Sequence, residues 1–161
     1  PAGFPPGHHF NHTGLSGIMG GEIGAFVEAF PRFLIWTASA GVMLVIASTI
    51  YVLLTPWKEF AEVRRGNTAA GLALGGAITG LALPMSSALA SSITLIDFAI
   101  WGVVALLLQL IVYRLVDLLL GGLPRRIEQD EMGAAAVLVA AKLASALILA
   151  AGLWDPALQR F

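Results

Sequence analysis

Four apolar segments limit most strongly how this chain can fold. The first carries no charged residue and, as a helix, spans about 33 Å, which is enough to cross the hydrocarbon core of a bilayer. Trp36, Tyr51 and Trp57 lie near its ends and are typical of interfacial aromatic residues. Hydrophobic residues make up 58% of the chain and charged residues only 12%, outside the range of soluble globular domains. The sequence therefore predicts an all-α membrane protein with four transmembrane helices, at residues 33–54, 69–92, 93–120 and 133–154.

Two glycine pairs at helical spacing mark the second apolar segment. Gly71 and Gly75 form one GxxxG pair, and Gly76 and Gly80 form another. Each pair removes side chains from one strip of a helix, so that another helix can approach closely. Pro84 is expected to kink this helix, and the serines that follow it to bond the carbonyls that it frees. We expect the glycines to form a helix-packing surface rather than a nucleotide loop, because they lie inside a membrane helix and follow no strand.

The chain is predicted to contain two tandem copies of a two-helix hairpin. Each copy is a long apolar helix, a charged connector that contains proline, and a helix rich in small residues. Because each copy crosses the membrane twice, both copies point the same way through it, unlike the inverted repeats of many transporters. The predicted divisions are a tail with an amphipathic segment at 1–31, repeats at 32–92 and 93–154, and a C-terminal tail at 155–161.

The N-terminal region is expected to lie outside the membrane core. Its first residues are rich in Pro, Gly and His and should be irregular, and His8, His9 and His12 are weak candidates for a metal site. A flexible tail is the alternative interpretation. Residues 15–30 place apolar side chains near one face, which predicts a short helix at the membrane surface that Pro31 ends. No cofactor is predicted.

The distribution of basic residues predicts the orientation in the membrane. Arg64 and Arg65 lie between the first and second helices, and Arg125 and Arg126 lie between the third and fourth. The turn between the second and third helices has no basic residue. By the positive-inside rule both charged connectors are cytoplasmic and both termini are periplasmic. A net charge of −1 gives no basis for nucleic-acid binding, and the lipid bilayer is the expected partner.

Lys142 is the least expected residue of the membrane segments. It lies nine residues after Gly133, about 13 Å into the fourth helix, where an unpaired ammonium is costly. Candidate partners are Gln109 at comparable depth on the third helix and the carbonyls near Pro84. Asp97 lies in the first turn of the third helix, nearer the outer surface. Lys142 is either a functional group that binds an anion or carries a proton, or a structural lysine that bonds within the bundle.

The first connector holds a second polar cluster. A solvated face is one interpretation, and a docking surface for a cytoplasmic partner or for anionic lipid headgroups is the other. Asn67, at the start of the second helix, is expected to cap it. The cluster consists of Glu59, Glu62, Arg64, Arg65 and Asn67.

Two groups of short motifs resemble a known family. The first group is Tyr51-Val-Leu-Leu-Thr-Pro, Glu59, Arg65-Gly66-Asn67 and Ala69-Ala70. The second is Gly75-Gly76, Gly80, Leu83-Pro84, Ser92, Asp97, Trp101-Gly102 and Gln109. In this order they resemble the bacterial inner-membrane family catalogued as domain of unknown function 350, over residues 33–154. The resemblance implies two copies of a two-helix unit in the inner membrane, and it supplies no reaction.

The sequence contains no enzyme signature, so we do not expect an enzyme. Nucleophile elbows, phosphate loops, HExxH motifs and carboxylate clusters at metal-ligand spacing are all missing. The leading hypothesis is a non-catalytic membrane subunit, either a homo-oligomer or part of a membrane complex. It would associate through the small-residue faces of the second and fourth helices. The alternative is a small ion or solute channel or transporter that uses Lys142 and Gln109.

Overall fold

The protein is all-helical and has four helices that are long and apolar enough to cross a membrane. The computed structural model describes residues 12–55 and 59–154, and within them it contains helices and turns but no strand. The candidate spans are Gly21–Leu54 within α1, then α3, α4 and α6. The predicted fold class is therefore confirmed. The elements are α1 His12–Leu54, α2 Glu59–Arg64, α3 Thr68–Ser91, α4 Leu95–Leu120, α5 Leu123–Glu128 and α6 Met132–Gly152.

The predicted end of a short helix at Pro31 is wrong. α1 begins at His12 and continues through Pro31 to Leu54. Proline removes one N–H donor from a helix, but membrane helices tolerate this loss, and the apolar sequence on both sides favours continuation. Contacts divide the chain into two units, residues 1–37 and 38–161. In the first unit the exposed rings of Phe26 and Phe30 lie 5.3 Å apart, and the predicted surface position of this segment stays a prediction.

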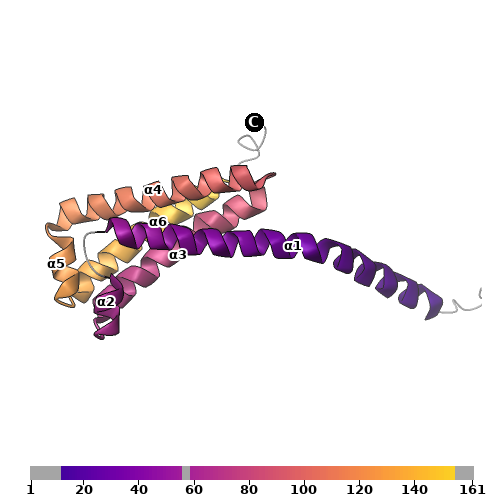
Figure 1. The fold of residues 1–161 in the computed structure, drawn as a ribbon, viewed down its shortest axis with the longest axis horizontal. Helices are drawn as coiled ribbons and strands as arrows, with labels where there is room; N and C mark the ends of the chain where they lie inside the picture. Colours follow the sequence, from indigo (N-terminus) through magenta and orange to yellow (C-terminus); the bar gives the residue numbers. More distant parts are fainter. Residues whose placement is uncertain (1–11, 56–58, 155–161) are drawn as a thin grey trace, which may run out of the picture. The chain divides into compact units, whose positions relative to one another are not determined.

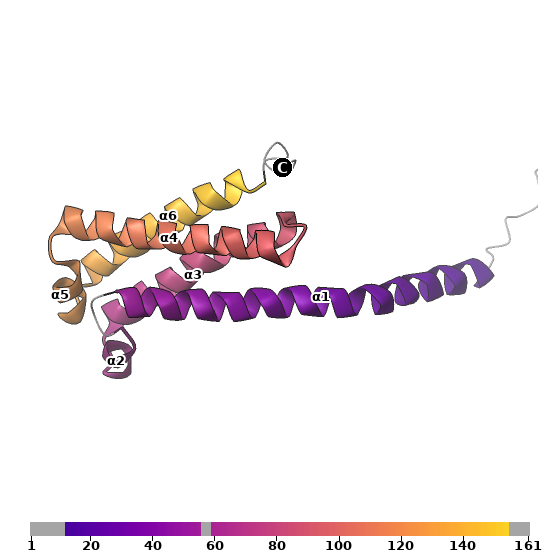
Figure 2. The same cartoon turned by 45° about the horizontal axis from the view of Figure 1, so that its top comes forward.

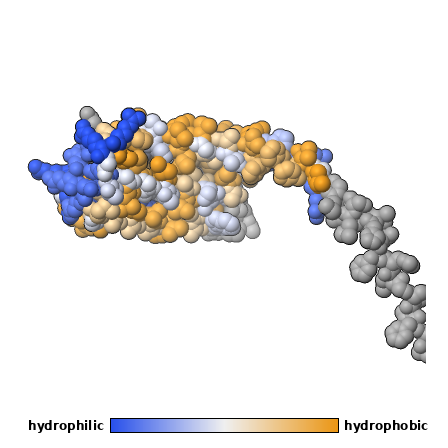
Figure 3. Space-filling model, turned by 90° about the horizontal axis from the view of Figure 1, so that it is seen from below, coloured by the Kyte–Doolittle hydropathy of each residue, from blue (hydrophilic) through white to orange (hydrophobic). Residues whose placement is uncertain are grey.

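Within the second unit, α3 is the central helix. Buried residues make up 56% of its most apolar window, against 33% for α4 and 28% for α6. Small side chains let α4 and α6 approach it closely, and the three helices pack side by side (Figures 1 and 2). The outer surface of these helices is mostly apolar, as expected for a bundle that faces lipid (Figure 3). The main core cluster comprises Ala69, Ala70, Ala73, Val112, Tyr113, Val116, Leu123, Ile127, Ala134, Ala135 and Leu138.

The two charged connectors fold alike. Each contains a six-residue helix, α2 or α5, that the sequence pattern did not predict. Each short helix is followed by a left-handed residue, Gly66 at φ +88° and Asp130 at φ +58°. The amide of this residue donates to the carbonyl three residues earlier at 3.0 Å in both connectors. Glycine adopts this conformation without strain, and Asp tolerates it better than most residues.

The two connector regions are also joined by hydrogen bonds. Asn67 caps α3 as predicted, since its side chain accepts from the Ala70 amide at 2.7 Å. The same side chain donates to the Ile127 carbonyl at 2.8 Å. In the other direction, the Asp130 carboxylate accepts from the Ala69 amide at 2.7 Å. The N-terminus of α3 is therefore capped by both connectors, which fixes the two hairpins relative to each other at this end.

An ion pair in the second connector predicts acid sensitivity. Arg126 Nε donates to Glu131 Oε2 at 2.7 Å, and this hydrogen bond holds the pKa of Glu131 below its usual value. Because the folded pKa is depressed, the stabilisation is complete above the unfolded pKa and is lost as pH falls through the folded one. We expect the melting temperature to fall as pH drops below about 4.3, the ordinary Glu value. Thermal unfolding in detergent between about pH 7 and pH 3 measures this effect.

The Glu131→Gln variant should lose this part of the acid sensitivity. Glu128→Gln is the matched control, because Glu128 is an exposed carboxylate of the same connector. Equal pH dependence of melting in wild type and Glu131→Gln would show that the pair does not contribute.

Candidate functional site

Lys142 of α6 is buried between the membrane helices. Its side chain is 0% exposed, and its Nζ donates a hydrogen bond to the Tyr51 hydroxyl of α1. The Nζ atom also lies 4.0 Å from the centroid of the Tyr51 ring, a cation–π distance. Tyr51 is only 1% exposed, so its ring is buried inside the bundle, and its predicted depth at the membrane interface stays a prediction. Its ring faces the core, where the ring of Tyr113 packs edge-on against it at 6.5 Å.

Gln109 of α4 bonds the backbones of two other helices. Its Nε2 donates to the Gly80 carbonyl of α3 at 3.0 Å and to the Lys142 carbonyl of α6 at 3.3 Å. The Gly80 carbonyl is the one that Pro84, four residues later, leaves without an intrahelical donor. Gln109 therefore takes the role that we predicted for the serines after Pro84. The prediction for the serines is wrong, because Ser86 bonds the Leu83 carbonyl at 2.7 Å and Ser91 the Ser87 carbonyl at 3.0 Å.

We call Tyr51, Gly80, Gln109 and Lys142 the polar node. It joins one residue from each of the four membrane helices α1, α3, α4 and α6. Lys142 and Gln109 meet as the sequence predicted, but Gln109 bonds the backbone carbonyl of Lys142, and the Lys142 amine bonds Tyr51. The Oε1 atom of Gln109 is buried without a hydrogen-bond partner. The node therefore links the four helices by hydrogen bonds.

The other predicted polar residues lie outside the node. Asp97 is partly exposed in the first turn of α4, where its amide donates to Thr94 Oγ1 at 3.1 Å. Arg64 is exposed at the end of α2, and Arg65 pairs with Glu62 at 2.7 Å. Asn67 is occupied in capping α3. The side chain of Glu59 lies outside the described residues.

The four predicted packing glycines divide into two pairs. A Cβ atom at Gly76 would lie 2.6 Å from Val139 Cγ2, and one at Gly80 would lie 2.8 Å from the Gln109 amide. These two glycines therefore contact α6 and α4 within the chain. Gly71 and Gly75 have no atom within 4 Å of such a Cβ. With the exposed Thr79, one turn further along, they form a strip that we call the open strip.

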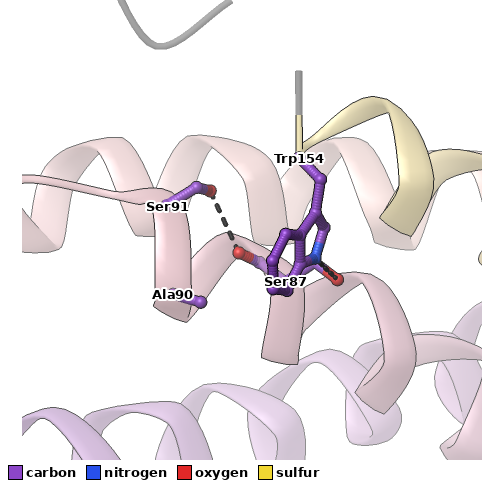
Figure 4. Close-up of a pocket in the computed structure, with 4 residues that line it drawn as sticks. All are labelled: Ser87, Ala90, Ser91 and Trp154. Carbon is purple, nitrogen blue, oxygen red and sulfur yellow. Dashed lines mark hydrogen bonds between the residues drawn. The ribbon is translucent and has the colours of Figure 1, made fainter. Parts of the chain in front are cut away.

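Two cavities lie beside α3. A small one of about 100 Å³ near its C-terminus is lined by Ser87, Ala90, Ser91 and Trp154, and the Trp154 indole donates to Ser87 Oγ at 3.2 Å (Figure 4). The second, of about 240 Å³, is a groove between α1, α2 and α3. Its lining consists of Leu44, Val45, Ser48, Thr49, Val52, Phe60, Leu74 and Ile78.

The histidine-rich tail cannot be placed as a metal site. His8 and His9 lie outside the described residues, and His12 is the first residue of α1. Among the residues whose positions are described, no group of three or more His, Asp or Glu side chains could hold a metal ion.

Comparisons with known proteins confirm the resemblance seen in the sequence. Residues 25–153 match the family model described as Domain of Unknown Function (DUF350). The chain is 34% identical over 109 residues to the UPF0719 inner membrane protein YjfL of Escherichia coli (strain K12), covering 68% of this chain and 83% of that protein. It is 27% identical over 112 residues to the UPF0719 transmembrane protein YshE of Bacillus subtilis (strain 168), covering 68% and 84%. No solved structure matches this chain.

Proposed function

This chain belongs to the DUF350 family of membrane proteins, and from that premise we propose that it is a non-catalytic inner-membrane subunit that self-associates. The open strip is the surface through which two copies meet. One observation carries the proposal. α3 uses one glycine pair to pack against helices of its own chain and leaves the other pair uncovered.

A second copy of the same strip is the best-matched partner. Small residues four apart let two membrane helices approach until their backbones touch, and a strip that meets itself satisfies twofold symmetry. The predicted small-residue face of α6 is used differently. Ala134, Ala135 and Ala146 are buried inside the chain. We therefore propose that the copies meet through α3 and not through α6.

Lys142 fits a structural role inside the subunit better than a role in transport. A transport role would need the amine to meet water or a passing solute. Instead its side chain is 0% exposed and bonded to Tyr51, and Gln109 is 0% exposed and bonded to two carbonyls. This arrangement favours a structural role for the polar node in the folded subunit.

Both termini are proposed to be periplasmic, with α2 and α5 on the cytoplasmic side. Arg64 and Arg125 are exposed in the connectors, whereas the turn that begins at the exposed Ile93 has no basic residue. The chain contains no cysteine, so single cysteines can be labelled without background. In intact cells, Ile93→Cys should react with a membrane-impermeant maleimide, and Glu128→Cys should react only after the membrane is opened. The reverse pattern would invert the orientation.

Gly75→Leu is expected to separate the copies while leaving the subunit folded. The leucine side chain would stand on the open strip, where a Cβ meets no atom of its own chain, and would block the close approach of a second helix. The dissociation constant of the oligomer should rise at least about tenfold, or roughly 1.4 kcal/mol. Native mass spectrometry and fluorescence energy transfer in bilayers measure it. Val103→Leu, on the exposed face of α4, is the matched control.

A single cysteine on the strip gives the same test a direct geometric form. Thr79→Cys should form an intermolecular disulfide under mild oxidation, because a disulfide needs Cα atoms within about 7 Å of each other. Val103→Cys should not. Wild-type protein that remains monomeric in bilayers at all concentrations, with no Thr79→Cys crosslink, would rule out the proposed function.

A further inference from the structure

The groove between α1, α2 and α3 has the length and chemistry of a lipid site. We propose that it binds one anionic phospholipid, with an acyl chain along the groove and the headgroup at Arg64 of α2. Self-association is not needed for this site, because the groove is lined by Leu74 and Ile78 of α3 and by none of the open-strip residues.

The groove lies in one leaflet and runs toward the connectors. Its deepest residue on α1, Leu44, lies ten residues before the helix ends at Leu54, which is about 15 Å. On α3 its deepest residue, Ile78, lies ten residues after Thr68, which gives the same depth. Half of a bilayer's hydrocarbon core is also about 15 Å. The groove is therefore as long as the acyl region of one leaflet, and six of its eight lining residues are apolar.

Ser48 places one hydroxyl group about midway along the groove wall. Its Oγ is buried without a partner on the groove wall, whereas the neighbouring Thr49 hydroxyl donates to the Val45 carbonyl at 2.7 Å. Ser48 lies six residues before Leu54, or about 9 Å below the end of α1.

The polar end of the groove is marked by a positive charge. Phe60 of α2 lines the groove, and Arg64, four residues later on the same face of the short helix, is exposed. Arg65 is already paired with Glu62 at 2.7 Å, so Arg64 is the arginine left to meet an anionic headgroup. The hydrophilic end of the bundle, formed by the connectors, is visible in Figure 3. A basic residue near an anionic membrane surface strengthens the attraction of an anionic lipid about fivefold.

The site can be tested on the full chain in bilayers of phosphatidylglycerol and phosphatidylcholine. Native mass spectra of wild-type protein should show one retained phosphatidylglycerol per protomer, in preference to phosphatidylcholine. Ile78→Phe and Val45→Phe fill the groove from opposite walls and should lose the adduct. Arg64→Gln should lower the preference for phosphatidylglycerol about fivefold, the equivalent of 1 kcal/mol. Arg125→Gln, an exposed arginine of the other connector, should leave it unchanged.

Two results would overturn the site. One is equal retention of the two lipids by wild type, and the other is an undiminished adduct in both groove-filling variants. If those variants changed only the ratio of monomer to dimer, a second copy and not a lipid would occupy the groove. The spectra count lipids and chains separately, so failure of the lipid site and failure of self-association are distinguishable.

Discussion

Replacing Lys142 with alanine is expected to lower the free energy of unfolding by about 3–5 kcal/mol. The substitution removes a fully buried side chain, leaves a cavity, and removes the amine that donates to the Tyr51 hydroxyl. Lys142→Met keeps most of the volume, so we expect its cost to be that of the hydrogen bond lost to Tyr51, about 1–3 kcal/mol. Equilibrium unfolding with denaturing detergent in mixed micelles measures both values.

The double variant separates a polar contact from simple packing. Lys142→Met combined with Tyr51→Phe removes both polar groups and keeps both shapes, and such replacements of buried polar pairs are often neutral or stabilising. We therefore expect the double variant to unfold within about 1 kcal/mol of wild type, even though each single change is costly. Leu147→Met, on the exposed face of α6, is the control. If Lys142→Met is as stable as wild type, the contact with Tyr51 contributes nothing.

The membrane helices could be predicted because the length of an apolar segment is enough to identify a helix that can span a membrane. The predicted second helix at 69–92 is α3 at Thr68–Ser91, and the fourth at 133–154 is α6 at Met132–Gly152. The rule, taken from soluble proteins, that a proline ends a helix failed in this apolar segment. Proline at position 31 was expected to end a helix and did not, because apolar sequence continues on both sides of it.

The polar node could be predicted only in part. Hydropathy identifies Lys142 as a charge inside an apolar segment, and such a lysine must have a partner. The rise per residue of a helix then places Gln109 at a comparable depth. Which atoms meet depends on how the helices are rotated, and sequence periodicity does not determine that rotation for helices that are apolar all round. Tyr51 illustrates the limit. An aromatic residue near a helix end is typical of the membrane interface. The side chain of Tyr51 nevertheless points into the bundle, where its hydroxyl accepts a hydrogen bond from Lys142.

Gly76→Leu is expected to lower the free energy of unfolding by about 3 kcal/mol or more. Even a Cβ at this position would lie 2.6 Å from Val139 Cγ2, and valine, branched at Cβ, has no other rotamer readily available in a helix. The remaining leucine atoms would have to separate α3 from α6, the pair that forms the centre of the bundle. The same detergent unfolding experiment measures the loss.

The neighbouring residue provides the control, because Gly75→Leu makes the same change where a Cβ meets nothing. Alanine at the same two positions is the stricter test. Alanine in place of glycine favours a helix by about 1 kcal/mol, so Gly75→Ala should stabilise the subunit. At Gly76 the clash, at about 1–3 kcal/mol, should outweigh that gain. Val139→Ala should then restore part of the stability of Gly76→Ala, because it removes the methyl groups in the way. Equal effects of alanine at positions 75 and 76 would mean that α3 does not present its two glycine pairs to different surroundings.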